Sequence, residues 1–412
     1  MKTNALKGMR DILPAEQRLR DYVQGKILET YRSAGFERIS TPILEDIENL
    51  DKSDGGDNLN LIFKVLKRGE KLSSALESEP SEKTLSDMGL RYDLTLPLTR
   101  FFAANRNALQ FPFKVIQTDR VYRAERPQKG RLREFVQCDI DIFGDSSPNA
   151  EVELIDVTAR AMLNIGFKDF SININDRRIL RNMIENMGFA PETIDSVCIT
   201  FDKLDKIGVE GIESELTEKQ FPEDAVKKLC AFISSGSEIT LDAVIAQCSD
   251  SSIGDDLKYI ISTSQAVAEG RYKITYCPNL VRGQGYYTGV VFEIACPQFS
   301  GAVGGGGRYD NMVGKFIGQP VPAVGFSIGF ERICGILFEQ GYKIPDSKER
   351  CALLYEDSTS FPEVLKIAEK LRENYTVSVI KKAKKAGPQF GMLEAQGYTK
   401  FAQIKDGEVI VK

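Results

Sequence analysis

The sequence predicts an α+β fold in which an antiparallel sheet is flanked by helices. Three observations indicate this class: two strand-like runs joined by a short polar loop (residues 113–125 and 135–144), a mainly helical stretch over residues 166–272, and a strand and helix alternation over residues 349–412. Two strands joined by a short loop form a hairpin and pair antiparallel. Regular alternation of strands and helices is typical of a small α/β domain.

Composition and charge limit the classes of protein to which the chain can belong. Its 412 residues are 42% hydrophobic and 27% charged, which is normal for a globular protein and too long for one core. No apolar run approaches the roughly 20 residues that cross a bilayer, and residues 1–12 lack the apolar stretch of a signal peptide. A cytoplasmic protein is expected. The net charge of −5 argues against a broad basic surface, so neither a membrane nor DNA is an expected partner.

Histidine is absent from the chain. This excludes the commonest general base, the nucleophile arrangements that depend on histidine, and every histidine-based metal site. The eight cysteines contain no C-x-x-C pair, so nothing indicates a zinc site and reduced, mostly buried thiols are expected. Any chemistry must use carboxylates, arginines, lysines and tyrosines.

The first elements follow from periodicity. Apolar residues at helical spacing predict a helix over residues 15–35, and a strand is predicted over 36–44. Pro42 places that strand at a sheet edge or an interface. A short strand is predicted over 61–66, and the composition of 71–87, rich in Ser and Glu, is typical of a mobile segment.

The later elements are predicted in the same way. They are a short strand feeding a helix over 90–103, one strand (170–175) at the start of the helical stretch, strands over 285–294 and 323–328, a helix over 330–340, and, near the C-terminus, strands over 351–355 and 376–380 with a helix over 362–373 between them.

The hairpin carries the first candidate site. Period-2 alternation in its second strand puts Gln137, Asp139 and Asp141 on one face and apolar residues on the other. A solvated surface is the commoner explanation of such a face. The basic residues around the loop favour a triphosphate ligand, because guanidinium groups bind phosphate oxygens in a bidentate fork, although a solvated charged loop stays the alternative. These basic residues are Arg120, Arg123, Arg126, Lys129, Arg131 and Arg133.

A second candidate site is rich in glycine, over residues 280–289 and 304–310. Closely spaced glycines let a backbone approach a ligand. A phosphate-binding loop is excluded, because Gly314-Lys315 is followed by Phe316 rather than Ser or Thr.

Taken together and in this order, the motifs resemble those of the histidyl-tRNA synthetases, which are class II aminoacyl-tRNA synthetases. The matching segments are residues 35–45 (motif 1), 90–95 (the amino-acid-binding turn), 123–141 (motif 2), 280–293 (the histidine-specific signature), 304–310 (the glycine-rich strand) and 325–332 (motif 3). The resemblance implies a class II antiparallel sheet and covers nearly the whole chain.

The resemblance also implies a role for each matching residue. Arg123 would hold the α-phosphate, Glu125 would face the adenine, and Arg131 and Arg332 would contact the phosphates of ATP, which carries Mg²⁺. Arg282 would bridge the substrate carboxylate and the α-phosphate, so Arg282 and Arg123 are the implied catalytic residues. The implied histidine-binding residues are Asp93, Thr95 and Gln137 for the α-amino group, Asp141 and Tyr287 for the imidazole, and Tyr286 and Tyr309 in the pocket wall.

This chemistry needs no general base. The attacking carboxylate of the amino acid is already ionised at neutral pH, so catalysis reduces to positioning and to stabilisation of charge at phosphorus. Arginines can supply both. The absence of histidine from the chain is therefore compatible with the reaction.

The resemblance implies four parts and a set of partners. Residues 1–165 would hold the first part of the catalytic domain, 166–272 a mainly helical insertion, 273–345 the second catalytic part, and 349–412 a shortened α/β domain similar to the anticodon-binding domain. The implied partners are L-histidine, tRNA(His) and, through motif 1, a second copy in a homodimer. Lysines over 381–385 could touch tRNA phosphates or form a solvated face.

One alternative function stays open. A catalytically silent synthetase paralogue regulates ATP phosphoribosyltransferase in histidine biosynthesis and has the same fold. Two departures from the enzyme pattern also stand in the sequence: Gln284-Gly285 replaces Leu-Asp, and Val136 replaces histidine or an aromatic residue. The arginines and Glu125 of the ATP site favour the enzyme.

Overall fold

The structure is a computed structural model that describes residues 1–51, 60–126, 132–201, 203–234, 239–281, 286–345, 347–405 and 408–411. The chain forms two compact units, Met1–Gly341 and Tyr342–Lys412. The four parts predicted from the sequence divide the chain more finely than these two units, and the boundaries between those parts stay predictions.

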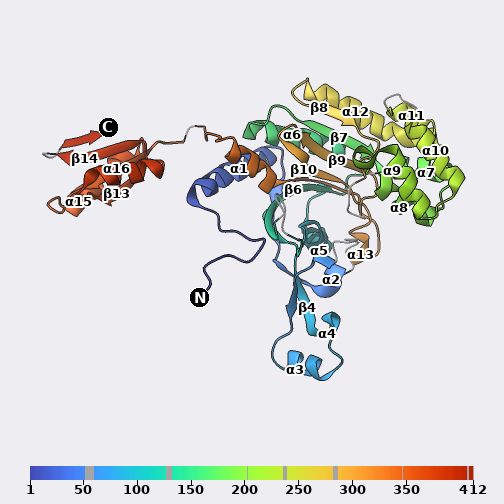
Figure 1. The fold of residues 1–412 in the computed structure, drawn as a ribbon, viewed down its shortest axis with the longest axis horizontal. Coiled ribbons are helices and arrows are strands. Elements are labelled where there is room, and N and C mark those ends of the chain that lie inside the picture. The colour runs from blue at the N-terminus through green and yellow to red at the C-terminus, as the bar shows by residue number, and fades with distance from the viewer. Residues whose placement is uncertain are drawn as a thin grey trace. The chain divides into compact units, whose positions relative to one another are not determined.

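An eight-stranded sheet forms the centre of the first unit (Figure 1). Its order is β1-β5-β6-β11-β10-β9-β7-β8; the six strands from β5 to β7 pair antiparallel, and only β1 and β8 at the edges pair parallel with their neighbours. The predicted antiparallel sheet is confirmed. The strands are β1 (Glu37–Arg38), β5 (Phe113–Tyr122), β6 (Glu134–Phe143), β7 (Ser171–Asp176), β8 (Lys273–Tyr276), β9 (Val290–Cys296), β10 (Phe299–Arg308) and β11 (Ala323–Ile328).

Three helices pack against one another and onto the middle of this sheet: α1 (Pro14–Ser33), α6 (Asn149–Ile165) and α14 (Phe330–Glu339). Helix α1 begins at a proline, whose fixed φ suits the first helical turn. Helix α6 ends at Gly166, which adopts a φ of 108° that a side chain would disfavour. Their apolar faces are buried, as the helical period of the sequence predicts.

The run over residues 36–44 departs from the single strand predicted. It is divided into β1 and a strand of another sheet, β2 (Leu44–Asp46), with Pro42 between them. Proline has no N–H to donate to a strand ladder, so the pairing stops there. The expectation of an edge position is confirmed, because β1 is an edge strand.

The polar segment after residue 60 forms regular structure. Residues 70–90 contain helices α3 (Glu70–Glu77) and α4 (Glu82–Leu85), followed by strand β4 (Ser86–Leu90). Ser81 and Thr84 cap α4 reciprocally. Strand β4 pairs with β2 and with β3 (Lys64–Leu66) in a small sheet, and α3 and α4 project beyond it (Figure 1).

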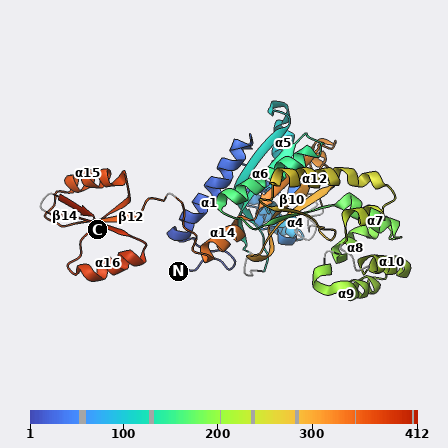
Figure 2. The same ribbon diagram turned by 90° about the horizontal axis from the view of Figure 1, so that it is seen from above.

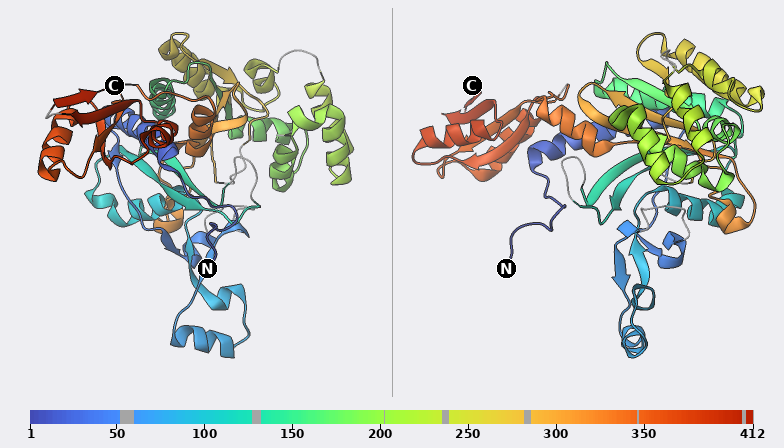
Figure 3. Two further views of the ribbon diagram at one scale, coloured as in Figure 1. Left: turned by 60° about the vertical axis from the view of Figure 1, so that its left-hand side comes forward. Right: turned by 45° about the vertical axis from the view of Figure 1, so that its right-hand side comes forward.

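The first helices of the helical stretch form a group beside the sheet, coloured green in Figure 3, whereas its last helix, coloured yellow, packs against α6 and the strands β7 and β8. Strand β8 follows it and was not predicted, because its alternation of polar and apolar residues covers only four positions. The helices are α7 (Arg177–Asn186), η3 (Pro191–Thr193), α8 (Ile194–Phe201), α9 (Leu204–Glu218), α10 (Glu223–Ile233), α11 (Leu241–Ile245), η4 (Ser251–Gly254) and α12 (Asp255–Ala268). The remaining helices of the first unit are α2 (Ile47–Asp51), α5 (Thr95–Asn105), η2 (Arg106–Ala108) and α13 (Gly314–Ile317).

The second unit is a four-stranded sheet of order β13-β12-β14-β15. Helices α15 (Phe361–Arg372) and α16 (Ala386–Ala395) lie on opposite faces of that sheet (Figure 2). Three strands are parallel and β15 is antiparallel, an α/β arrangement like the one predicted. The strands are β12 (Arg350–Tyr355), β13 (Thr376–Lys381), β14 (Lys400–Lys405) and β15 (Glu408–Val411).

Candidate active site

A cavity of about 470 Å³ lies over the strands β6, β10 and β11. Most of the residues predicted to bind ATP or histidine line it. They are Thr95, Arg123, Glu125, Gln137, Asp141, Tyr286, Tyr287, Tyr309 and Arg332. The fold thus brings together residues that are separated by more than two hundred positions in the sequence.

Among the described residues, one predicted binding residue, Asp93, is not part of the cavity wall. Asp93 is 2% exposed and lies in the turn before α5, where its Oδ1 accepts a hydrogen bond from the Leu96 N–H at 3.2 Å. Arg131 and Arg282 lie outside the described residues, as do Gln284 and Gly285. The roles assigned to them stay predictions.

Bare backbone forms the floor of the cavity. A Cβ added to Gly306 would lie 2.0 Å from the Gly325 carbonyl oxygen, and one added to Gly304 would lie 2.9 Å from the Ser327 carbonyl oxygen. On β11, a Cβ at Gly325 would lie 1.9 Å from Asp141 Oδ1. Only glycine fits at these positions, so β10 and β11 present main chain to a ligand.

Asp141 is the acidic residue that the sequence assigned to the imidazole. It is 4% exposed, and the Tyr309 hydroxyl donates a hydrogen bond to its Oδ1 at 2.5 Å. Burial raises the pKa of Asp141 to about 7, although the hydrogen bond from Tyr309 works in the opposite direction. Tyr286 packs edge-on against Tyr309, with 5.9 Å between the ring centroids. The carboxyl group is therefore held rigidly in the pocket wall.

Two arginines line the same cavity and are themselves positioned. Arg123 donates from Nε to the Tyr92 carbonyl at 2.9 Å, and its guanidinium lies 5.2 Å from the centre of the Phe135 ring. Arg332 lies 5.2 Å from the centre of the Phe299 ring and donates to the Ala302 carbonyl. Guanidinium groups fixed in this way suit an anionic ligand such as a phosphate chain.

Glu331, a residue of the cavity wall, connects these elements to helix α1. Arg20 of α1 forms two hydrogen bonds of 2.6 Å with Glu331, and Glu331 also accepts the Val136 N–H at 3.1 Å. The carboxylate of Glu331 thereby joins α1, α14 and β6 next to Arg332. No local pattern in the sequence indicates this pair, because its members are 311 positions apart.

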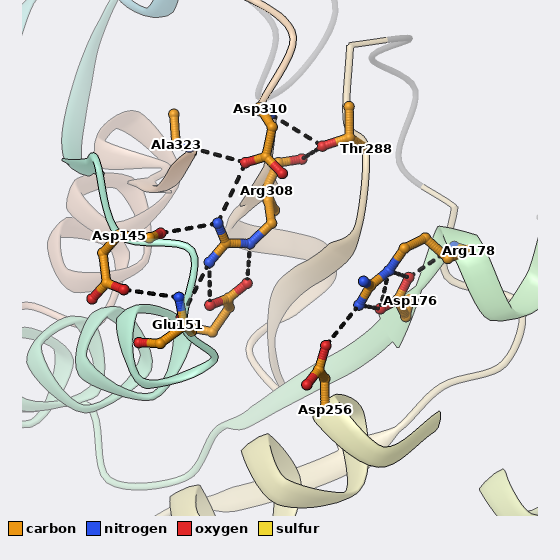
Figure 4. Close-up of polar contacts among 10 residues, drawn as sticks. Asp145, Glu151, Asp176, Arg178, Asp256, Thr288, Arg308, Asp310 and Ala323 are labelled. Carbon is orange, nitrogen blue, oxygen red and sulfur yellow. Dashed lines mark hydrogen bonds and ion pairs between the residues drawn. The ribbon is translucent and has the colours of Figure 1, made fainter. Parts of the chain in front are cut away.

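A second network supports the glycine-rich strand (Figure 4). Arg308 makes two 2.6 Å bonds to Glu151 of α6 and further bonds to the Asp145 carbonyl and to Asp310. Asp310 in turn accepts the Ala323 N–H at 3.0 Å, and its own N–H donates to Thr288 Oγ1 at 3.1 Å. This network holds β10, the start of β11 and the residues beside Tyr287. Glu151 stands in none of the sequence motifs and was not predicted as part of it.

A family model described as histidyl-tRNA synthetase matches residues 8–333 of the chain. A histidine--tRNA ligase of Leifsonia xyli subsp. xyli is 42% identical over 97% of this chain and 94% of the relative. A histidine--tRNA ligase of Porphyromonas gingivalis is 35% identical over 90% of this chain and 85% of the relative.

Solved structures match over the whole chain. The histidyl-tRNA synthetase of Nostoc sp. PCC 7120 aligns with a TM-score of 0.80 at 25% identity, covering 100% of this chain and 97% of that one. A protein of Bacillus halodurans C described as an ATP phosphoribosyltransferase regulatory subunit/histidyl-tRNA synthetase aligns with a TM-score of 0.78 at 20% identity, covering 98% of both chains. The second likeness concerns the fold alone and does not favour the regulatory function.

The family model, the relatives and the cavity agree with the resemblance read from the sequence. The chain belongs to the histidyl-tRNA synthetase family.

Proposed function

We propose that this chain is a histidine--tRNA ligase, which activates L-histidine with ATP to histidyl-adenylate and transfers it to the 3′ end of tRNA(His). The observation that carries the proposal is one cavity that contains two fixed arginines, Arg123 and Arg332, together with the polar face of β6, which bears Gln137 and Asp141. Arginines suit the triphosphate, and the polar face suits an amino acid with a hydrogen-bonding side chain.

In the first step the histidine carboxylate attacks the α-phosphorus of ATP and pyrophosphate leaves. Arg123, and Arg282 by resemblance, would neutralise the negative charge that develops there, while Arg332 would hold the phosphates and Glu125 would face the adenine. In the second step the terminal ribose of the tRNA takes the aminoacyl group and AMP leaves.

Specificity for histidine would come from Asp141 and Tyr287. Asp141 is buried and accepts a hydrogen bond from Tyr309, so it can also accept one from an imidazole N–H. An amino acid without that donor would leave a buried carboxyl group without the second partner, at a cost of about 1–3 kcal/mol.

Magnesium would arrive with ATP. Among the described residues, no group of three or more cysteine and carboxylate side chains could hold a metal ion. Mg²⁺ commonly binds through phosphate oxygens with one or two carboxylates and water, so a dedicated cage is not needed. Its part would be to neutralise phosphate charge.

We also propose a homodimer that acts in the cytoplasm, where tRNA is charged. The exposed apolar side chains of Ile43 and Leu44, in the motif 1 segment, support an interface there. No helix among the described residues is long and apolar enough to cross a membrane.

In the second unit, Lys381 and Lys382 form ion pairs with Asp357 and Glu356, each at 2.7 Å. A tRNA phosphate that binds these lysines would therefore compete with the two carboxylates.

Histidine-dependent exchange of pyrophosphate into ATP tests the proposal. We expect exchange with L-histidine and not with other amino acids, followed by charging of tRNA(His). Arg123→Ala should lower the exchange rate by about 100-fold or more, as removal of one charge-stabilising group does. Arg120→Ala is the matched control, because Arg120 lies on β5 three residues before Arg123, does not line the cavity, and has a side chain that is 63% exposed in an ion pair with Glu134.

The opposite result would support the regulatory alternative. A wild-type protein that catalyses no exchange and instead binds an ATP phosphoribosyltransferase would overturn the proposed activity. Equal losses in Arg123→Ala and Arg120→Ala would remove Arg123 from its proposed role.

A further inference from the structure

Asp139 of strand β6 has no role in the proposed reaction as described so far. Asp139 lies between Gln137 and Asp141 on the polar face of the strand, and all three line the cavity. It is only 5% exposed. A buried carboxyl group in a ligand cavity is costly unless something pairs with it, so its presence needs a physical reason.

Three buried acceptor atoms in this region have no hydrogen-bond partner among the described residues. They are Asp93 Oδ2, Gln137 Oε1 and Asp139 Oδ1. The other polar atoms of the same side chains are satisfied: Asp93 Oδ1 accepts from the Leu96 N–H, and Gln137 Nε2 donates to Asp139 Oδ2 and to Ser327 Oγ, each at 3.4 Å. The three acceptor oxygens therefore lack a hydrogen-bond donor among the described residues.

The Gln137 amide is oriented by Asp139. Because its nitrogen donates to Asp139 Oδ2 and Ser327 Oγ, its carbonyl oxygen is the atom left for a ligand. Asp139 therefore has two functions. Its Oδ2 orients the Gln137 amide, and its Oδ1 has no hydrogen-bond partner among the described residues.

A primary ammonium group has the matching chemistry. It carries three N–H donors, no acceptor and one positive charge, against three acceptors of which two belong to carboxyl groups. We propose that Asp139 is a further substrate-binding residue, which binds the α-ammonium group of the amino-acid substrate together with Asp93 and Gln137. This inference rests on the proposed function, since it assigns a further contact in the same site.

The electrostatic surroundings of Asp139 agree with a cationic ligand. Burial, and then the neighbouring Asp141 and Asp93, raise the pKa of Asp139 well above its usual value, whereas Ser327 and Arg123 lower it. A bound ammonium adds positive charge beside these carboxyl groups and favours their ionised forms. A cationic group therefore binds beside these carboxyl groups more favourably than a neutral one.

The test compares wild type with Asp139→Asn, which keeps the shape and removes the charge. In histidine-dependent pyrophosphate exchange, we expect the KM for histidine to rise by about 10- to 100-fold, the range for loss of one charged hydrogen bond, with the KM for ATP unchanged. Asp21→Asn is the matched control, because Asp21 is exposed on α1 and should leave both constants at their wild-type values.

A substrate analogue separates ammonium binding from packing. 3-(Imidazol-4-yl)propanoate has no amino group, so it should inhibit Asp139→Asn as well as or better than wild type. A parallel loss of affinity for histidine and for this analogue would overturn the inference, because it would indicate a structural role. Thermal unfolding should give a Tm for Asp139→Asn no lower than that of wild type, since a buried carboxyl group with an unpartnered oxygen is removed.

Each remaining outcome has one meaning. Exchange by wild type with an unchanged histidine KM in Asp139→Asn would refute the role of Asp139 and leave the proposed function intact. No exchange by wild type would refute the proposed function itself. If Asp139→Asn does not fold, Asp139→Ser replaces it in the same assays and must show the same selective loss for histidine over the analogue.

Discussion

Asp141 links the chemistry of the pocket to the stability of the empty protein. Its pKa is raised to about 7, mainly by burial. Because the folded-state pKa lies above the unfolded value, the protonated carboxyl group stabilises the fold fully below about pH 4, and this stability is lost as the pH rises through about 7. A ligand that pairs with the ionised form offsets that loss.

Asp141→Asn should remove this pH dependence, because the amide does not titrate. Between pH 4 and pH 8 the free energy of unfolding of wild type should fall relative to that of the variant by on the order of 4 kcal/mol, since each unit of pKa shift corresponds to about 1.4 kcal/mol. Denaturant unfolding of both proteins without ligands, at the two pH values, measures the difference. A difference that is the same at both values would contradict the raised pKa of Asp141.

Individual site residues could be predicted where they stand in a motif. Arg123, Gln137, Asp141 and Tyr309 were named from the sequence and line the cavity. Arg20 and Glu151 were not, because each acts through a partner that is far away in the sequence and adjacent only after folding. A single sequence carries local patterns, and such pairings are not local.

Helix α6 pairs with two other elements through ion pairs of very different burial. Glu151 is 2% exposed and bonds twice to the buried Arg308, whereas Glu153 pairs with Lys114 where the two side chains are 34% and 28% exposed. An exposed pair is screened by water, while loss of one partner of a buried pair leaves a charge unpaired. The two pairs lie on one helix, so they form a natural comparison.

Glu151→Ala should destabilise the protein by about 3–5 kcal/mol, because Arg308 would stay buried without its carboxylate. Glu153→Ala, the control, should cost no more than about 1 kcal/mol. Urea unfolding monitored by circular dichroism measures both. Similar costs for the two variants would mean that the Arg308 network does not support β10 and its neighbours as described.

The elements were predicted best where periodicity was long. The helices α1 and α14 and the strands β5, β6 and β11 begin and end within a few residues of their predicted limits. Three short elements were missed: β8 has one buried residue to mark it, and α3 and α4 lie in a polar segment whose composition does not indicate them. Propensity over four to eight residues is too weak to decide such segments.

At the scale of the whole molecule, we expect the two compact units to have different functions: amino-acid activation in the first and tRNA binding in the second. A chain that ends at Gly341 keeps the eight-stranded sheet and the entire cavity wall, so we expect it to retain histidine-dependent pyrophosphate exchange. Its kcat/KM for tRNA charging should fall by at least about tenfold, because phosphate contacts from the second unit would be lost. Parallel assays of exchange and charging on the shortened and full chains test this.

Loss of exchange in the shortened chain would contradict the prediction, provided that circular dichroism shows it to be folded. Retained charging would instead show that residues 342–412 contribute little to tRNA binding.

The overall architecture was predictable because the hairpin, the helical stretch and the α/β alternation occupy separate parts of the sequence. The pairing order of the eight strands was not, since β6, β11 and β10 come together from distant positions.

The glycine floor of the cavity has a consequence for inhibitor design. Drug resistance commonly arises when a target changes a side chain that contacts the drug, but β10 and β11 present main chain that admits no side chain at Gly306 or Gly325. A compound lying against this surface would touch atoms that a point mutation cannot replace without disturbing the carbonyl of Gly325 or the carboxylate of Asp141. Escape from such a compound would have to come from residues elsewhere in the wall.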